Sequence, residues 1–210
     1  MSYKAFTSRS FKINLVNLIK EIENSSLVEI VVISKPKSYH YNDNYLWASF
    51  GVMAVAFTFM MFAPIIINMY LIYIYTMLSF IGTYLLLHIF PFLGRLFISK
   101  SKMARNVDIY GRAIFQKAGI RYTQERIGVL FYISYFEKMV YVIPDRGAFM
   151  RLPEDLWAQI SKDMNSIFHS AFPASAFLKK LEGLKEIFAK YIPPIENDIN
   201  ELPDKINVNL

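Results

Sequence analysis

The sequence predicts a small mixed α/β domain that is interrupted by a two-helix transmembrane hairpin. No charged residue occurs between Asp43 and Arg95. One helical and one strand-like pattern precede this neutral segment, and further helices and a pair of strands follow it. Because one helix and one strand cannot bury a core alone, the two flanking segments must fold together. We expect a sheet of three or four strands covered by helices.

The neutral segment is too long for a single membrane span. As one helix it would extend about 73 Å, more than twice the roughly 30 Å hydrocarbon core of a bilayer. We therefore expect two spans, Leu46–Ile66 and Tyr70–Phe92. The chain reverses around Pro64 and Asn68, because a proline and an amide favour a break in a helix.

Lysine and arginine residues flank the neutral segment on both sides. These residues are Lys35, Lys37, Arg95, Lys100, Lys102 and Arg105. A hairpin returns both its ends to one side of the membrane, and flanking cations mark the cytoplasmic side. The sequence thus predicts a multi-pass protein of the cell (inner) membrane, with both termini and the α/β domain cytoplasmic. Tyr45, Trp47 and Arg95 are expected at the membrane interface.

Composition and charge exclude several kinds of site and classes of partner. The hydrophobic fraction of 54% exceeds the roughly 45–50% of soluble domains, which indicates contact with lipid. The absence of cysteine excludes disulfides, thiolate metal sites and a cysteine nucleophile. The net charge of +6 gathers beside the neutral segment, which favours lipid headgroups and excludes nucleic acid as a partner.

Upstream of the hairpin, the sequence predicts a helix and a strand. Ser10 is the expected N-cap of the helix, and Asn24 to Ser26 end it. The β-branched run Leu27–Ile33 is typical of a buried strand, which Pro36 ends. The apolar residues of the helix recur at spacings of three and four: Phe11, Leu15, Leu18 and Ile22.

Downstream of the hairpin, a helix from Met103 to Arg121 precedes two strands, Ile127–Tyr135 and Met139–Ile143. A tight turn at Glu137 and Lys138 joins the strands. Two amphipathic helices follow, with apolar positions at Leu156, Ile160, Met164 and Ile167, and then at Phe177, Leu181, Leu184, Phe188 and Tyr191. We expect four parts: the first helix and strand (1–45), the hairpin (46–94), the rest of the α/β domain (95–195) and an acidic tail (196–210).

The run GVLFYISYFEKMVYVIPDRG at 128–147, the helix around Trp157 and NELPD at 200–204 together resemble the TPM domain family. This family is named after thylakoid-lumen, photosystem-repair and nematode receptor-accessory proteins, and the chain is most similar to its membrane-embedded bacterial branch. The resemblance implies a Rossmann-like α/β sandwich and a role in the assembly, maintenance or repair of membrane complexes. The residues that carry the family motif are Glu29, Gly128, Glu137, Asp145, Gly147, Asn200, Glu201, Leu202, Pro203 and Asp204.

The same resemblance implies phosphatase activity and calcium binding, both attributed to lumenal members of the family. Those members export the domain, whereas the charges here predict a cytoplasmic one. Apart from the resemblance, no HExxH, P-loop or GxSxG pattern occurs. The sequence therefore favours a protein that is not an enzyme and has no cofactor.

Few residues remain as candidates for chemistry. Asp145 is the candidate catalytic residue, because it follows a strand end in a proline and glycine turn, where α/β sheets collect ligands. The alternative, which we favour, is an Asx turn. Glu137 is expected to be a solvated turn residue. Asp198, Glu201 and Asp204 have oxygen ligands for Ca²⁺, although a tail packed on the surface fits them better.

Three functions follow from these patterns. The leading hypothesis is a membrane-anchored accessory, assembly or maintenance factor that binds the lipid bilayer and other membrane-protein subunits. The alternatives are a TPM-type phosphatase or metal-dependent hydrolase, and a tethered calcium or small-ligand sensor. An enzyme should bring at least three acidic or histidine residues into one pocket, from the set Glu29, Asp145, His169, Asp198, Glu201 and Asp204.

Overall fold

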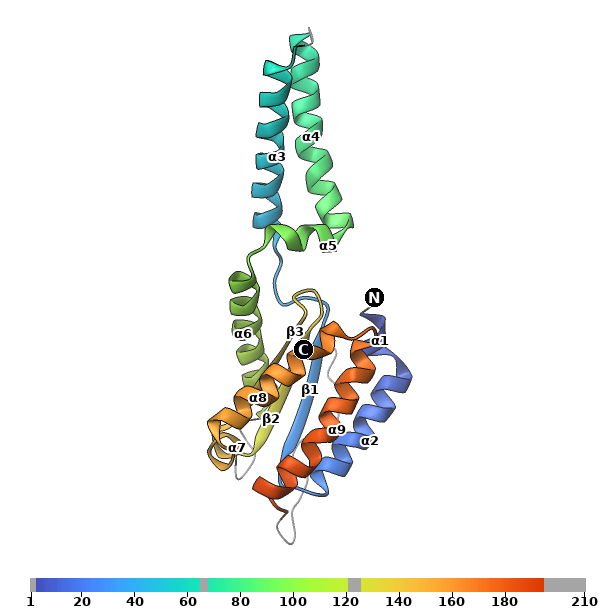
Figure 1. Cartoon of the computed structure of the whole chain (residues 1–210), viewed down its shortest axis with the longest axis vertical. Helices are drawn as coiled ribbons and strands as arrows, with labels where there is room; N and C mark the ends of the chain where they lie inside the picture. The colour runs from blue at the N-terminus through green and yellow to red at the C-terminus, as the bar shows by residue number, and fades with distance from the viewer. Residues whose placement is uncertain (1–2, 65–67, 121–125, 195–210) are drawn as a thin grey trace. The chain divides into compact units, whose positions relative to one another are not determined.

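The computed structural model describes residues 3–64, 68–120 and 126–194. The chain divides into two compact units (Figure 1). The first, which we call the α/β unit, comprises Met1–Ser38 and Ala104–Leu210. The second, the hairpin unit, comprises Tyr39–Met103. The α/β unit is therefore built from two stretches of chain that the hairpin unit separates in sequence.

A three-stranded mixed sheet forms the centre of the described α/β unit. Its strands are β1 (Glu29–Lys35), β2 (Gly128–Ser134) and β3 (Met139–Pro144), in the order β1-β2-β3. β1 runs parallel to β2, and β3 runs antiparallel to it. All three predicted strands are confirmed within two residues at each end. Every residue of β2 is buried, so this central strand supplies both faces of the core.

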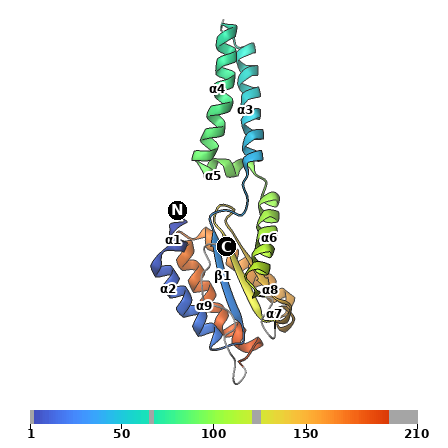
Figure 2. The ribbon, with the colours of Figure 1, turned by 180° about the vertical axis from the view of Figure 1, so that it is seen from behind.

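Helices pack on both faces of the sheet. On one face lie α2 (Arg9–Glu23), α8 (Glu154–Asn165) and α9 (Pro173–Tyr191), whose apolar side chains join those of the strands in the larger core. α2 and α9 run side by side in both views (Figures 1 and 2). On the other face, α6 (Lys100–Lys117) packs through residues such as Val107 and Ile114. The predicted mixed α/β fold is confirmed at this level.

Short helices account for two local differences from the sequence prediction. The helix α1 (Lys4–Thr7) precedes α2, so the N-cap of α2 is Ser8 and not Ser10. The Ser8 hydroxyl accepts a hydrogen bond from the Phe11 backbone N–H at 3.3 Å. The predicted turn after β3 continues into a short helix, α7 (Arg146–Arg151). The short helix η3 (Ser166–His169) links α8 to α9.

The hairpin unit contains α3 (Asn42–Phe62) and α4 (Met69–Ile89), followed by α5 (Pro91–Gly94) and η1 (Arg95–Phe97). The predicted reversal is confirmed, because Pro64 lies between α3 and α4 and the side chain of Asn68 caps α4. The predicted second span was too long. The observed helix α4 ends at Ile89, because Pro91 disfavours helical backbone at the residue before it. That residue, Phe90, has φ −114° and ψ 80°.

α3 and α4 are both 21 residues long and apolar enough, by length and composition, to cross a membrane. They pack against each other, and the buried hydroxyls of Ser49 and Thr76 donate to carbonyls of their own helices. At the base of the pair, the Lys102 ammonium lies 2.8 Å from the Asp43 carboxylate. This contact ties the first turn of α3 to the chain that follows α4.

Gly128 occupies a place where any side chain would clash. A Cβ atom there would lie 2.2 Å from Cγ2 of Ile120, which is fully buried. We expect Gly128→Ala to lower the free energy of unfolding by about 1–3 kcal/mol through overpacking. Gly183 in α9 has open space around it, so Gly183→Ala should raise stability by about 0.5–1 kcal/mol. Denaturant unfolding of the two variants measures both effects, and equal midpoints would contradict the packing described here.

Candidate functional site

The amino and carboxyl ends of the parallel pair β1–β2 bring different candidate site residues together. In α/β sheets, ligands bind at the carboxyl ends of the parallel strands. Asp145 follows β3, which runs antiparallel to that pair, so it lies at the amino end. Its backbone N–H donates to the Gly128 carbonyl at 2.8 Å, and Gly128 pairs with Glu29. The reason for choosing Asp145 as a catalytic candidate was therefore wrong.

The side chain of Asp145 serves its own backbone. It is the N-cap of α7, and its Oδ1 accepts a hydrogen bond from the Arg146 N–H at 2.8 Å. The Gly147 N–H, from the same motif, donates to the Arg126 carbonyl at 2.9 Å. Among the residues that the structure describes, no three His, Asp or Glu side chains form a group suited to a metal ion. Glu29 and Asp145 share the amino end of the sheet, whereas His169 lies in η3.

A buried polar network occupies the carboxyl end of the strand pair. We call Ser38, Tyr132, Ser134 and Glu137 the Glu137 cluster. Although Glu137 lies in the turn between β2 and β3, its exposed fraction is 0%, so the expectation of a solvated turn residue was wrong. Its Oε1 accepts from the Ser38 backbone N–H at 3.0 Å, and its Oε2 accepts from the Ser134 hydroxyl. These two donors stabilise the buried carboxylate.

The hydroxyl groups extend this network into the sheet. The Ser38 oxygen lies 2.7 Å from the Ser134 oxygen and 2.8 Å from the Tyr132 phenol oxygen. Burial raises the pKa of Tyr132 above its ordinary value, so the phenol stays neutral. A serine bonded to a carboxylate resembles a nucleophile with its base. Because all four residues are buried, however, a substrate has no access to them. The cluster therefore has a structural role and holds the end of the first stretch of chain to β2 and the turn that follows it.

The Glu137 cluster fixes the point at which the chain leaves the α/β unit. Ser38 is the last residue of the first stretch of that unit, and it binds residues from Tyr132 to Glu137 that lie far along the sequence. Backbone bonds from Tyr135 to Lys35 and from Phe136 to Pro36 continue the pairing beyond the strands. The sequence did not indicate the cluster. Ser134 and Glu137 lie close together in one segment, but Ser38 comes from a distant segment, and no local pattern connects it to them.

A second polar group links α6 to β3 near the surface. The Tyr141 hydroxyl donates to the Asp108 carboxylate, and Nε of Arg112 lies 2.8 Å from the same carboxylate oxygen. Burial alone would raise the pKa of Asp108, but the hydrogen bonds from Tyr141 and Arg112 outweigh it and lower the pKa. As a largely exposed ion pair it contributes about 0–1 kcal/mol, so it aligns α6 on the sheet more than it stabilises the fold.

The remaining predicted site residues lie in the hairpin unit or outside the described residues. Tyr45 faces inward in the hairpin unit, with its ring 5.2 Å from the His88 ring, whereas Trp47 is 76% exposed. Arg95 begins η1. The NELPD motif at 200–204 and the calcium candidates Asp198, Glu201 and Asp204 lie outside the described residues. The calcium site therefore stays a prediction.

The fold and the cluster define a mixed α/β domain with an apolar helical hairpin inserted between its first two strands. No protein-family model matches the sequence, and no curated protein matches it. The structure is similar to the NMR structure of the BA42 protein from the psychrophilic bacterium Bizionia argentinensis. The TM-score is 0.56 at 16% sequence identity, over 95% of this chain and 92% of that chain. At this identity the similarity shows the fold alone.

Replacement of Glu137 should weaken the fold strongly. Glu137→Gln keeps the shape of the side chain but removes the charge and places an amide group opposite two donors. We expect a loss of about 2–3 kcal/mol in the free energy of unfolding, measured in denaturant. Glu182→Gln, at an exposed position on α9, is the control and should change stability by less than about 0.5 kcal/mol. Equal free energies of unfolding of the two variants would show that the cluster does not stabilise the fold.

Proposed function

We propose that this protein is a membrane-anchored accessory or assembly factor of the TPM type. Its hairpin and its cytoplasmic α/β domain bind other membrane-protein subunits. The observation that carries this proposal is the uncovered apolar surface of α3 and α4. Side chains such as Phe62, which is 84% exposed, and Trp47 point away from the hairpin. Apolar surface of this extent marks contact with lipid or with another protein.

The hairpin has the other properties that a bilayer requires. Along α3 and α4 the backbone is helical, and the buried hydroxyls of Ser49 and Thr76 bond to their own helices. Cations flank both ends of the hairpin, and the connector residues from Pro64 to Asn68 carry none. By the positive-inside rule, the α/β unit lies in the cytoplasm and the connector on the other side of the inner membrane.

Two of the three described family-motif carboxylates, Asp145 and Glu137, support a binding module over a hydrolase. Asp145 caps a helix, and Glu137 is enclosed by its hydrogen-bond donors. Neither is placed to act on a substrate. A Rossmann-like sandwich of the TPM type, with helices on both faces of the sheet, would then serve as a rigid base for contacts with other subunits.

Because the chain lacks cysteine, single cysteines report its topology directly. In spheroplasts, a membrane-impermeant maleimide should label Pro64→Cys between α3 and α4. It should not label Ser170→Cys in the α/β unit until the membrane is opened. Mass shifts of the purified chain measure the labelling. Extraction of the protein by carbonate without detergent, or labelling of Ser170→Cys in intact spheroplasts, would refute the proposed anchoring or orientation.

Partner binding is tested by photocrosslinking from both units. A benzoylphenylalanine placed at Phe50 on α3, and separately at Met150 on α7, should crosslink to the same membrane protein, because both side chains are exposed. The control position, Phe131, is buried in β2 and should give no intermolecular product. Mass spectrometry identifies the crosslinked chains.

Two results would count against the accessory role. One is a chain that remains a monomer and crosslinks only to lipid. The other is hydrolysis of a phosphomonoester that is lost in Asp145→Ala, which would favour the hydrolase instead.

A further inference from the structure

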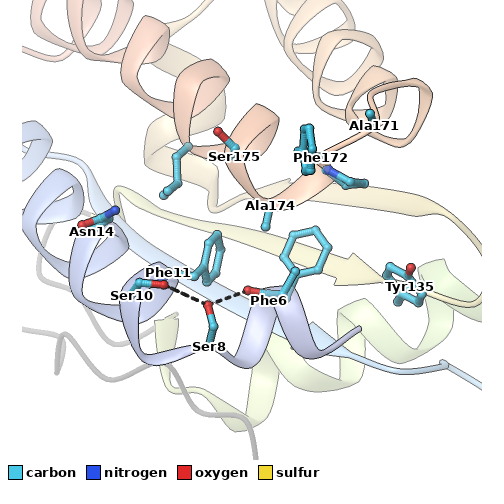
Figure 3. Close-up of a pocket in the computed structure, with 13 residues that line it drawn as sticks. Phe6, Ser8, Ser10, Phe11, Asn14, Tyr135, Ala171, Phe172, Ala174 and Ser175 are labelled. Atoms are coloured by element: carbon cyan, nitrogen blue, oxygen red, sulfur yellow. Dashed lines mark hydrogen bonds between the residues drawn. The ribbon is translucent and has the colours of Figure 1, made fainter. Parts of the chain in front are cut away.

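A pocket of about 590 Å³ opens in the α/β unit between the first turns of α2 and α9. We call it the α2–α9 pocket (Figure 3). Its volume lies within the roughly 300–1,000 Å³ of small-molecule sites. The residues that line it are Ala5, Phe6, Ser8, Ser10, Phe11, Asn14, Tyr135, Ala171, Phe172, Pro173, Ala174, Ser175 and Leu178.

The lining combines apolar walls with a few uncharged polar groups. Figure 3 shows the rings of Phe6 and Phe11 rising from the α1–α2 segment toward the turn that precedes α9. Leu178 and Phe172 contribute further apolar surface. The polar groups are three serine hydroxyls, the Tyr135 hydroxyl and the Asn14 amide, and none of the lining residues is charged. Such a surface suits a molecule with an apolar body and a single small polar head.

The position of the pocket in the sheet is that of a ligand site. Tyr135 directly follows β2, so the pocket lies at the carboxyl end of the parallel pair. Its ring packs with Phe6 and Phe168 on the face that α2 and α9 cover. On the opposite face, the same end of the sheet is closed by the Glu137 cluster. The α2–α9 pocket is thus the open part of the edge where α/β sheets bind ligands.

The charges near the pocket favour an anionic head group. Three cations, Lys4 in α1 and Arg9 and Lys12 in the first turn of α2, lie in the same segment as the lining residues from Ala5 to Asn14, and the first acidic residue of the chain is Glu21. The positive ends of the α2 and α9 dipoles also point toward this region. A dianionic phosphate would need a cation in the lining, whereas hydroxyl and amide groups suit a monoanion.

We propose that the α2–α9 pocket binds a single-chain amphiphile with a carboxylate head, such as a medium-chain fatty acid. The chain packs against Phe172 and Leu178 above the buried rings of Phe6 and Phe11, and the carboxylate meets the hydroxyls at the mouth, including Ser10 and Ser175. This inference goes beyond the accessory role and uses no feature of the hairpin unit. Its failure would leave the proposed anchoring intact.

The test uses the full chain in a non-ionic detergent and a diazirine derivative of decanoate as a photolabel. Mass spectrometry should find the label on peptides that contain Phe6 to Asn14 or Phe172 to Leu178. Unlabelled decanoate should displace it at a concentration about tenfold lower than decylamine or decanol. Labelling confined to α3 and α4, or equal displacement by the amine, would overturn the proposal.

A matched pair of substitutions on α2 localises the site. Asn14 lines the pocket and Asn17 does not, and both side chains are exposed. Asn14→Trp should reduce labelling about tenfold by filling the pocket, while Asn17→Trp leaves it unchanged. Denaturant unfolding confirms that both variants are folded. If Asn14→Trp does not fold, Ser175→Trp fills the mouth from α9, and undiminished labelling in the folded variant would refute the site.

Discussion

The structure depends on the parallel pairing of β1 with β2. β2 is buried along its whole length, so it needs a strand on each side and a helical layer on each face. β3 follows directly, but β1 comes from before the hairpin unit. A chain that crosses a bilayer between these two strands must cross it an even number of times, as in our proposal. Closing such a long connection is tolerable, because doubling its length costs only about 0.6 kcal/mol.

The Glu137 cluster strengthens this pairing just after β1, where the chain leaves the α/β unit. The backbone N–H of Ser38, the last residue of the first stretch, and the hydroxyl of Ser134, the last residue of β2, both donate to the carboxylate of Glu137 in the turn after β2. Burial of a charge is costly, and the cost is offset only when donors saturate it. Loss of either serine side chain would remove hydrogen bonds from the buried groups of the cluster. The end of β1 is thereby held in place although the chain immediately leaves the unit.

Sequence patterns predicted the elements well and the candidate site poorly, for one physical reason. Helices and strands follow from local periodicity, so the reversal at Pro64 and the strands around Leu130 and Val142 were predictable. The burial of Glu137 depends on Ser38, which no local pattern connects to it. The position of Asp145 depended on the direction of β3 relative to the parallel pair. The α2–α9 pocket likewise requires the pairing of two helices from opposite ends of the chain.

The carboxyl end of the sheet has two faces with opposite properties, and strand geometry explains the difference. Successive side chains of β2 alternate between faces, so Tyr132 and Ser134 point toward α6 and join the Glu137 cluster. Tyr135 packs on the other face, where α2 and α9 both begin. A helix that begins at an edge leaves N–H groups there without partners in the helix. The sealed face therefore holds the fold together, and the face at which two helices start is the one that remains available for a ligand.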